Sequence, residues 1–205
     1  MYDSVVQVIF IASAMIAITN PFGNLPMFID MASDLTDGAR RHLFRLIVYV
    51  GFAIVLVFAL VGVPIMKHFF RLGVEELQVA GGILLLVLGI KNLLFPPGDA
   101  DSANKPQRGE EAVHERIVPM AFPILVGPGT LSTVIILVDL HGFAKSFIGF
   151  FVAFVIIFIV FFLARYIERL LGKLVLFILS RIMQVFISAI GVSMIETGIR
   201  TIISR

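Results

Sequence analysis

The sequence has no cysteine, and charged residues are scarce. Without cysteine the chain has no disulfide bond, thiolate metal site or thiol nucleophile. Only 15% of the 205 residues are charged and 59% are hydrophobic, whereas about 25% of an average soluble domain is charged. This composition excludes an ordinary soluble globular protein. The N-terminal MYDSVVQ also lacks lysine and arginine, so we expect no cleaved signal peptide before the first apolar run.

Six apolar stretches account for most of the chain. About 20 apolar residues are needed for a helix to cross a hydrocarbon core of about 30 Å. We therefore predict an all-α integral membrane protein with six transmembrane helices. The predicted spans are residues 4–32, 43–66, 77–95, 117–140, 147–164 and 182–203, of which the first and the fourth are interrupted.

Lysine and arginine are distributed unequally between the two sides that six spans create. One side carries Lys67, Arg71, Lys145, Arg200 and Arg205. The other side carries Arg40, Arg41, Arg45, Lys91, Lys105, Arg108, Arg116, Arg165, Arg169, Lys173 and Arg181. Because cytoplasmic loops carry the excess of basic residues, we predict that the second side is cytoplasmic. Both termini are then external, which means periplasmic in a bacterium.

The longest polar segment is PPGDADSANKPQRGEEAVHE, residues 96–115. It is rich in proline, glycine and acidic residues, and it cannot bury enough apolar area to offset its ordering entropy. We predict a mobile cytoplasmic linker, with a regulatory or docking tail as the alternative. The linker would join a first three-span repeat, residues 1–95, to a second, residues 116–205, within one membrane domain.

The two halves resemble each other. When Gly129 is laid on Gly23, Gln184 falls on Gln78 without a gap, and each half opens with an interrupted span followed by two unbroken ones. Each half crosses the membrane an odd number of times, so the second enters from the opposite side. The sequence therefore predicts two inverted three-helix repeats, an architecture found in many secondary transporters.

The interruptions are TNPFGNLP, residues 19–26, and VGPGTLS, residues 126–132. A proline inside a helix removes a backbone donor and costs about 3 kcal/mol. Asn24 and Thr130 match under the repeat, and both residue types cap helix N-termini, so we predict that new helices start there. Irregular backbone at membrane depth must be buried in protein or reached by water. Two matched breaks favour a binding site over the alternative, a packing kink.

The breaks predict the chemistry of the ligand. The N-terminus of a restarted helix carries about half a positive charge and free N–H groups, which favour an anionic group such as a carboxylate. The carbonyls that end the preceding segments suit an ammonium group or a sodium ion. No lysine or arginine lies within the interrupted spans to balance a net anion. A small zwitterion fits this arrangement best.

The two motifs also carry a family resemblance. NPFGNLP in the first span and FPILVGPGTLSTV at the start of the second half resemble the signatures of the MarC family of six-span bacterial membrane proteins. The resemblance covers nearly the whole chain. It implies a bacterial inner-membrane protein, and some members are described as transporters of neutral amino acids such as glycine and alanine. Asn20 stands where aspartate is common in the family.

We therefore predict a secondary transporter of small neutral solutes, most plausibly alanine or glycine, working by alternating access around the two broken helices. The candidate substrate and ion site consists of Asn20, Pro21, Gly23, Asn24, Gly127, Pro128, Gly129, Thr130, Ser132 and Thr133. Gln78, Gln184 and Glu196 are candidates for a polar path. For the two glutamines contact with lipid headgroups is the alternative, and for Glu196 an ion pair with Arg200 one turn further on.

Other expectations concern partners and competing functions. We expect a zwitterionic substrate, a surrounding lipid bilayer and no nucleic acid, with a homo-oligomer left open. We expect no cofactor, and a coupling ion could be sodium or a proton. The four histidines fall at span ends or in loops, which disfavours a membrane-embedded enzyme. A non-transporting scaffold or regulator, and an exporter of another small solute or ion, remain as alternatives.

Overall fold

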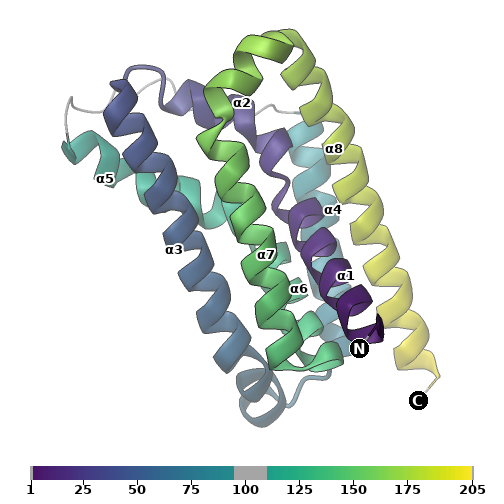
Figure 1. The fold of residues 1–205 in the computed structure, drawn as a ribbon. Helices are drawn as coiled ribbons and strands as arrows, with labels where there is room; N and C mark the ends of the chain where they lie inside the picture. The colour runs from purple at the N-terminus through teal and green to yellow at the C-terminus, as the bar shows by residue number, and fades with distance from the viewer. Residues whose placement is uncertain (1, 95–109, 205) are drawn as a thin grey trace.

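The computed structural model describes residues 2–94 and 110–204, and nearly all of them are helical (Figure 1). In chain order the elements are α1 (Tyr2–Thr19), α2 (Pro21–Met31), α3 (Asp37–Pro64), the π-helix η1 (Ile65–Phe70), α4 (Val74–Leu94), α5 (Glu110–Pro119), the π-helix η2 (Met120–Leu125), α6 (Pro128–His141), α7 (Phe143–Phe162) and α8 (Ala164–Ile203). The all-α prediction is confirmed. Local signals set several ends: the Thr36 hydroxyl caps α3 at the N–H of Ala39, and α6 stops at Gly142, which has φ 79°.

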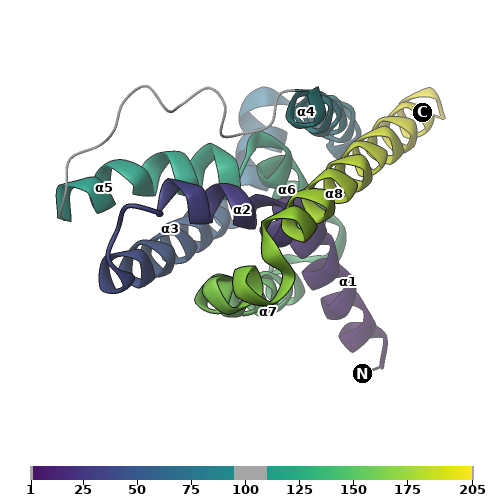
Figure 2. The same cartoon turned by 90° about the horizontal axis from the view of Figure 1, so that it is seen from above.

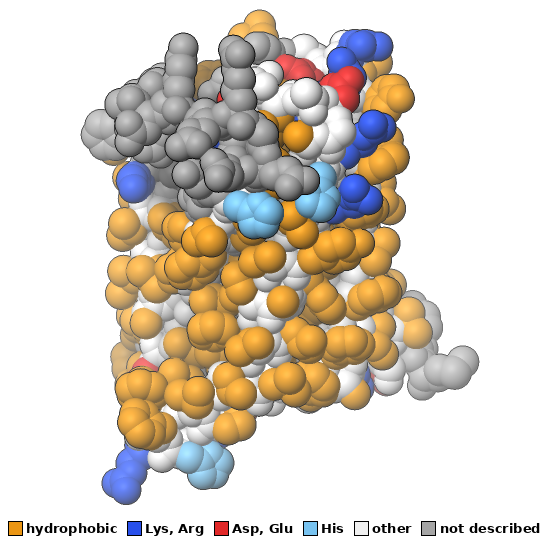
Figure 3. Space-filling model, turned by 90° about the vertical axis from the view of Figure 1, so that its left-hand side faces the viewer, with side chains coloured by type: hydrophobic (Ala, Val, Ile, Leu, Met, Phe, Trp, Pro, Cys, Tyr) orange, Lys and Arg blue, Asp and Glu red, His pale blue; other side chains and the backbone are white. Residues whose placement is uncertain are grey.

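Four segments within the described residues are long and apolar enough to cross a membrane. They are Asp3–Ile29, Asp37–Phe70, Phe143–Phe162 and Leu174–Ile203. A fifth is formed if Arg116–Leu125 and Pro128–His141, which meet at 57°, make one bent span. The face drawn in Figure 3 carries a broad band of hydrophobic side chains, with charged and histidine side chains gathered beyond the band. These features are those of a multi-pass membrane protein.

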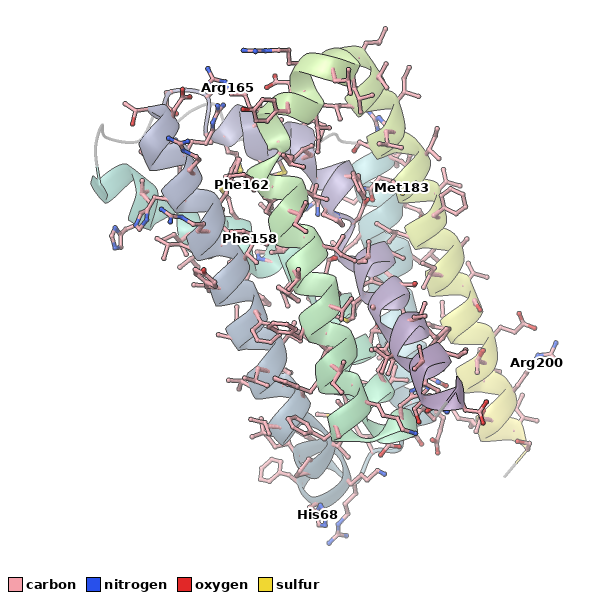
Figure 4. The ribbon with its side chains drawn as sticks, in the orientation of Figure 1. His68, Phe158, Phe162, Arg165, Met183 and Arg200 are labelled. Carbon is pink, nitrogen blue, oxygen red and sulfur yellow. The ribbon has the colours of Figure 1, made fainter. Side chains whose placement is uncertain are left out.

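The two termini lie at the same end of the bundle (Figure 1). His68 in η1 and Arg200 in α8 lie toward that end, whereas Arg165 lies at the opposite end (Figure 4). The predicted placement of these segments on alternate sides agrees with this arrangement. The more basic end predicted from the sequence is therefore the end that carries Arg165.

Helix α6 lies inside the bundle, where α1, α3, α4 and α7 pack around it (Figure 2). Every residue from Gly129 to Val138 is buried, as expected of a helix with neighbours on every side. Helix α4 packs along α8, while α3 packs against α7 and α2 against α8. At the more basic end, Arg116 of α5 donates to the Met31 carbonyl at 2.8 Å and pairs with Asp34 at 2.7 Å. This contact fixes α5 to the end of α2.

Three segments differ from the sequence prediction. Residues 165–181, predicted as a loop, belong to the long helix α8, in which Gly172 alone departs from helical geometry with φ 74°. Residues 110–115 of the predicted linker form the first turns of α5, and the rest of that linker lies outside the described residues. The arm before the second break is also irregular, because Phe122 is extended (φ −140°, ψ 128°) within η2. Pro123 in this arm interrupts regular helix hydrogen bonding.

Candidate functional site

The first break lies at Asn20, between α1 and α2. Asn20 has a positive φ of 44°, and its Oδ1 accepts a hydrogen bond from the N–H of Gly23 at 3.0 Å. Asn20 is therefore the N-cap of α2, and Pro21 is the first helical residue, where its missing N–H costs nothing. The prediction that Asn24 caps this helix is wrong. The turn at Asn20 restarts the helix one turn earlier than the repeat indicated.

The second break lies at Gly127, between η2 and α6. Gly127 is the N-cap of α6 with extended backbone (φ −86°, ψ 175°), and Pro128 is again the first helical residue. The prediction that Thr130 caps this helix is therefore wrong as well. Glycine has no side chain to cap the helix. The backbone N–H groups of Gly129 and Thr130, in the first turn, are thus among the donors that an α-helix cannot satisfy internally.

The two breaks meet through the side chain of Asn24. Its Nδ2 donates to the carbonyl of Thr19, the last residue of α1, at 3.0 Å. The same atom lies 3.4 Å from the carbonyl oxygen of Ile124, which precedes the second break. Each of these carbonyls lies in the last turn of a helical segment and lacks the N–H that a continued helix would supply. Asn24 therefore joins the two interrupted helices at their open ends.

Two buried polar atoms, one at the first break and one on α8, have no hydrogen-bond partner among the described residues: Asn20 Nδ2 and Gln184 Oε1. Both residues are only 4% exposed. Ser180 Oγ donates to the carbonyl of Gly23 at 2.7 Å, and Ile187 clusters with Ile18. Gln184 lies one turn after Ser180 on α8, and its backbone carbonyl lies against Gly89 of α4. The first break thus has a buried unpaired donor, and α8, which packs against α2, has a buried unpaired acceptor.

Three hydroxyl groups at the breaks bond to carbonyls of their own helices. Ser132 Oγ donates to the carbonyl of Pro128 at 3.1 Å, and Thr133 Oγ1 donates to that of Gly129 at 2.9 Å. Thr19 Oγ1 likewise donates to the Met15 carbonyl at 2.8 Å. The hydroxyl protons are thus used within the helices, while the oxygen lone pairs remain available as acceptors.

The candidate path residues do not share one environment. Gln184 is buried, which contradicts contact with lipid headgroups at that position, whereas Gln78 is half-buried. Glu196 is exposed and pairs with Arg200 across one helical turn, with Oε1 2.8 Å from a guanidinium nitrogen. The ion-pair alternative for Glu196 is confirmed. Of these three side chains, Gln184 is the one that is buried.

The sequence predicted open carbonyls where the segments before the breaks end, at Thr19 and at Val126. It missed two groups: the carbonyl of Ile124, which is the one that Asn24 contacts before the second break, and the hydroxyl of Ser180. Ser180 carries no comparable signal, since its contact with Gly23 joins residues from opposite halves of the chain. The structure therefore adds α8 to a site that the sequence placed on the two broken spans alone.

Comparison with known proteins agrees with this arrangement of apolar helices. A family model described as MarC family integral membrane protein matches residues 5–203. The chain belongs to this family. It is similar to the UPF0056 membrane protein YhcE of Escherichia coli, with 31% identity over 192 residues that cover 91% of this chain and 88% of that protein.

Two further relatives support the same assignment. The UPF0056 membrane protein YvbG of Bacillus subtilis is 27% identical over 199 residues, which are 94% of each chain. The UPF0056 inner membrane protein YhgN of Escherichia coli is 33% identical over 131 residues, which are 64% of each chain. No solved structure matches the chain. The protein is thus an integral membrane protein of the MarC family.

The arrangement at the breaks can bind polar groups through uncharged atoms. It offers N–H donors at the start of α6, an amide donor at Asn20 and an amide acceptor at Gln184. In the part of the chain that the structure describes, no group of three or more His, Asp or Glu side chains could hold a metal ion.

Proposed function

We propose that this protein is a secondary transporter of small neutral solutes, most plausibly amino acids such as alanine and glycine. The observation that carries the proposal is the meeting of two broken helices at a buried centre, where Asn24 bonds the ends of both. Buried unpaired polar atoms are rare and each calls for an explanation. A polar solute that binds Asn20 Nδ2 and Gln184 Oε1 in another conformation supplies one.

The proposal includes six spans in two inverted repeats, with α4 as the span beyond the five apolar segments. The contacts between the halves support this arrangement. Under the repeat, α1, α2, α3 and α4 correspond to α5, α6, α7 and α8. Helix α3 packs against its own counterpart α7, and α4 against its counterpart α8. The contact of α2 with α8 corresponds to that of α6 with α4, and the contact of α1 with α7 corresponds to that of α5 with α3. This pattern is the one that a pseudo-two-fold axis generates.

The groups at the breaks favour a zwitterion as substrate. A carboxylate would bind at the uncapped N-terminus of α6, where N–H groups and the helix dipole both favour negative charge. An ammonium group would bind the carbonyls of Thr19 and Ile124 and the Oε1 of Gln184, which are acceptors. Because α1, α2 and α6 contain no lysine or arginine, a net anion would lack a counter-charge.

Alternating access would require the bond between Asn24 and Ile124 to open and close. In this conformation Asn24 occupies the two carbonyls that would bind an ammonium group. Rocking of one half against the other would free them and admit water to one side of the breaks. We place the protein in the inner membrane of a bacterium, with both termini external and the more basic end cytoplasmic. The coupling ion is left as sodium or a proton.

The test is transport of labelled alanine and glycine by the purified protein in liposomes, with a sodium gradient, a proton gradient or neither. Uptake above that of protein-free liposomes, increased by one gradient, is the expected result. A reporter fused after Arg205 should report an external C-terminus. If folded protein gives no flux of either amino acid under any gradient, transport of these substrates is refuted. The bond network of Asn24 would then be a packing device in a scaffold protein.

A further inference from the structure

A cleft of about 320 Å³ lies between α3 and α7, away from the helix breaks. Its apolar wall includes Phe158 and Phe162 of α7, which Figure 4 shows along the side of that helix that adjoins α3. Its polar wall is formed by Arg41 and Arg45 of α3, and Gly38 lies at the same end. The cleft therefore combines an aromatic surface with two positive charges.

The two arginines of this cleft are free to bind a ligand. Arg41 and Arg45 are one helical turn apart, so they project from the same face of α3, and both are exposed. The neighbouring Arg40 and Arg165 each pair with Asp37. Among the described residues neither Arg41 nor Arg45 forms an ion pair. Asp37 also lies near Arg41, but its carboxylate is in direct contact with Arg40 and Arg165, so neither cleft arginine has an ion-pair partner of its own among the described residues.

The cleft lies at the boundary of the apolar region. Asp37–Phe70 and Phe143–Phe162 are both apolar enough to cross a membrane, and the cleft is formed where the first begins and the second ends. Phe158 and Phe162 are thus at the level where a span ends, with the arginines beside them. Guanidinium groups at this depth sit among lipid phosphates, whereas phenylalanine rings adjoin acyl chains.

We propose that this cleft is a binding site for an anionic phospholipid. The phosphodiester lies between Arg41 and Arg45, because a guanidinium group presents donors in a fork that matches phosphate oxygens. One acyl chain lies along the phenylalanine wall. A soluble phosphate ion would leave that apolar wall exposed to water, so the shape and lining of the cleft favour the lipid. This site is separate from the proposed transport site and does not depend on it.

The test is native mass spectrometry of the purified protein in detergent, with added phosphatidylglycerol or phosphatidylcholine. Phosphatidylglycerol should remain bound, with affinity at least about tenfold higher than that of phosphatidylcholine, the ratio that about 1.4 kcal/mol gives. The double variant Arg41→Gln/Arg45→Gln should lose this preference. Lys91→Gln/Arg169→Gln, which removes two charges predicted at the same end but outside the cleft lining, should keep it.

A second variant tests the cleft without altering charge. A Cβ atom at position 38 would have nothing within 4 Å, so Gly38→Leu should be tolerated by the fold. Because Gly38 lines the cleft, the leucine side chain should fill part of it and reduce phosphatidylglycerol binding. Unchanged binding by both Gly38→Leu and the double arginine variant overturns the proposal. An equal loss in the control variant would also overturn it, since the effect would then be general surface charge. Displacement of the lipid by millimolar inorganic phosphate would instead assign the site to a soluble anion.

Discussion

Asn24 and Ile124 lie 100 residues apart in the chain, yet Asn24 Nδ2 is 3.4 Å from the carbonyl oxygen of Ile124. The same amide nitrogen is 3.0 Å from the carbonyl of Thr19. One side chain therefore satisfies the open end of each helical segment that stops before a break. If the two halves move relative to each other during transport, the contact between Asn24 and Ile124 must break and re-form.

Removing the amide of Asn24 should destabilise the protein. In Asn24→Ala the carbonyls of Thr19 and Ile124 lose their donor, which should lower the free energy of unfolding by about 1–3 kcal/mol. Asn24→Asp keeps the shape but replaces the donor with an acceptor, so it should be at least as destabilising. Unfolding in detergent, followed by circular dichroism, measures both. Wild-type stability in Asn24→Asp would show that the hydrogen bonds are unimportant.

Substitution of Gln184 separates stability from function. Its buried Oε1 has no partner among the described residues. Gln184→Leu replaces this unsatisfied amide with an apolar side chain of similar size, so the free energy of unfolding should be unchanged or higher. If the amide binds the solute, flux of alanine should fall at least about tenfold, the effect of losing about 1.4 kcal/mol. Thr197→Val, on an exposed part of α8, is the matched control. A flux equal to wild type in Gln184→Leu would remove this residue from the site.

The sequence located both breaks correctly, because Pro21 and Pro128 cannot continue a helix whatever surrounds them. It misidentified the caps. Asn20 caps α2 through its bond from the N–H of Gly23 while its backbone has a positive φ, and local patterns do not reveal that choice. Asn24 is thereby released for a contact with Ile124 that is set by tertiary packing. The internal repeat aligned Asn24 with Thr130. In the structure the equivalent residues are instead Pro21 and Pro128, which begin α2 and α6.

The burial of Gln184 was missed for a related reason. Lys173 and Arg181 made residues 165–181 look like a loop, so the last span was predicted to begin at residue 182 and Gln184 to lie near its entry. The apolar segment of α8 in fact begins at Leu174. Arg181 is accommodated because its guanidinium group donates to the carbonyl of Leu93. A charged residue within a span can thus make the sequence-based boundary of that span too short, so that residues near the charge are predicted closer to the membrane surface than they are.

Close packing of α4 on α8 depends on Gly82. A Cβ atom at this position would lie 2.5 Å from the carbonyl oxygen of Gly191, a backbone atom that cannot move aside alone. Gly82→Ala should therefore lower the free energy of unfolding by about 1–3 kcal/mol through overpacking. Gly38→Ala, which has nothing within 4 Å, should be neutral or more stable by up to about 1 kcal/mol. Equal effects in the two variants would contradict the close approach.

Glu196 should be dispensable for transport. It is exposed and bonded to Arg200 within α8, with 2.9 Å between the guanidinium Nε and Oε1, and an exposed pair of this kind contributes only about 0.3–0.5 kcal/mol. Glu196→Gln should therefore retain the flux and the gradient dependence of the wild type in liposomes. Loss of proton-driven flux in this variant would instead place Glu196 on a proton path.

The central claim is that the helix breaks form a solute site that water reaches in turn from each side. The natural absence of cysteine allows a direct test with Thr130→Cys, since Thr130 is in the first turn of α6 and only 3% exposed. Thr201→Cys, on an exposed part of α8, is the control. The measurement is the rate of alkylation by a water-soluble maleimide in membranes, with and without alanine. We predict slow alkylation at position 130 that saturating alanine reduces several-fold, with no change at position 201. Absence of alkylation at 130, or a rate that alanine does not alter, would contradict the account.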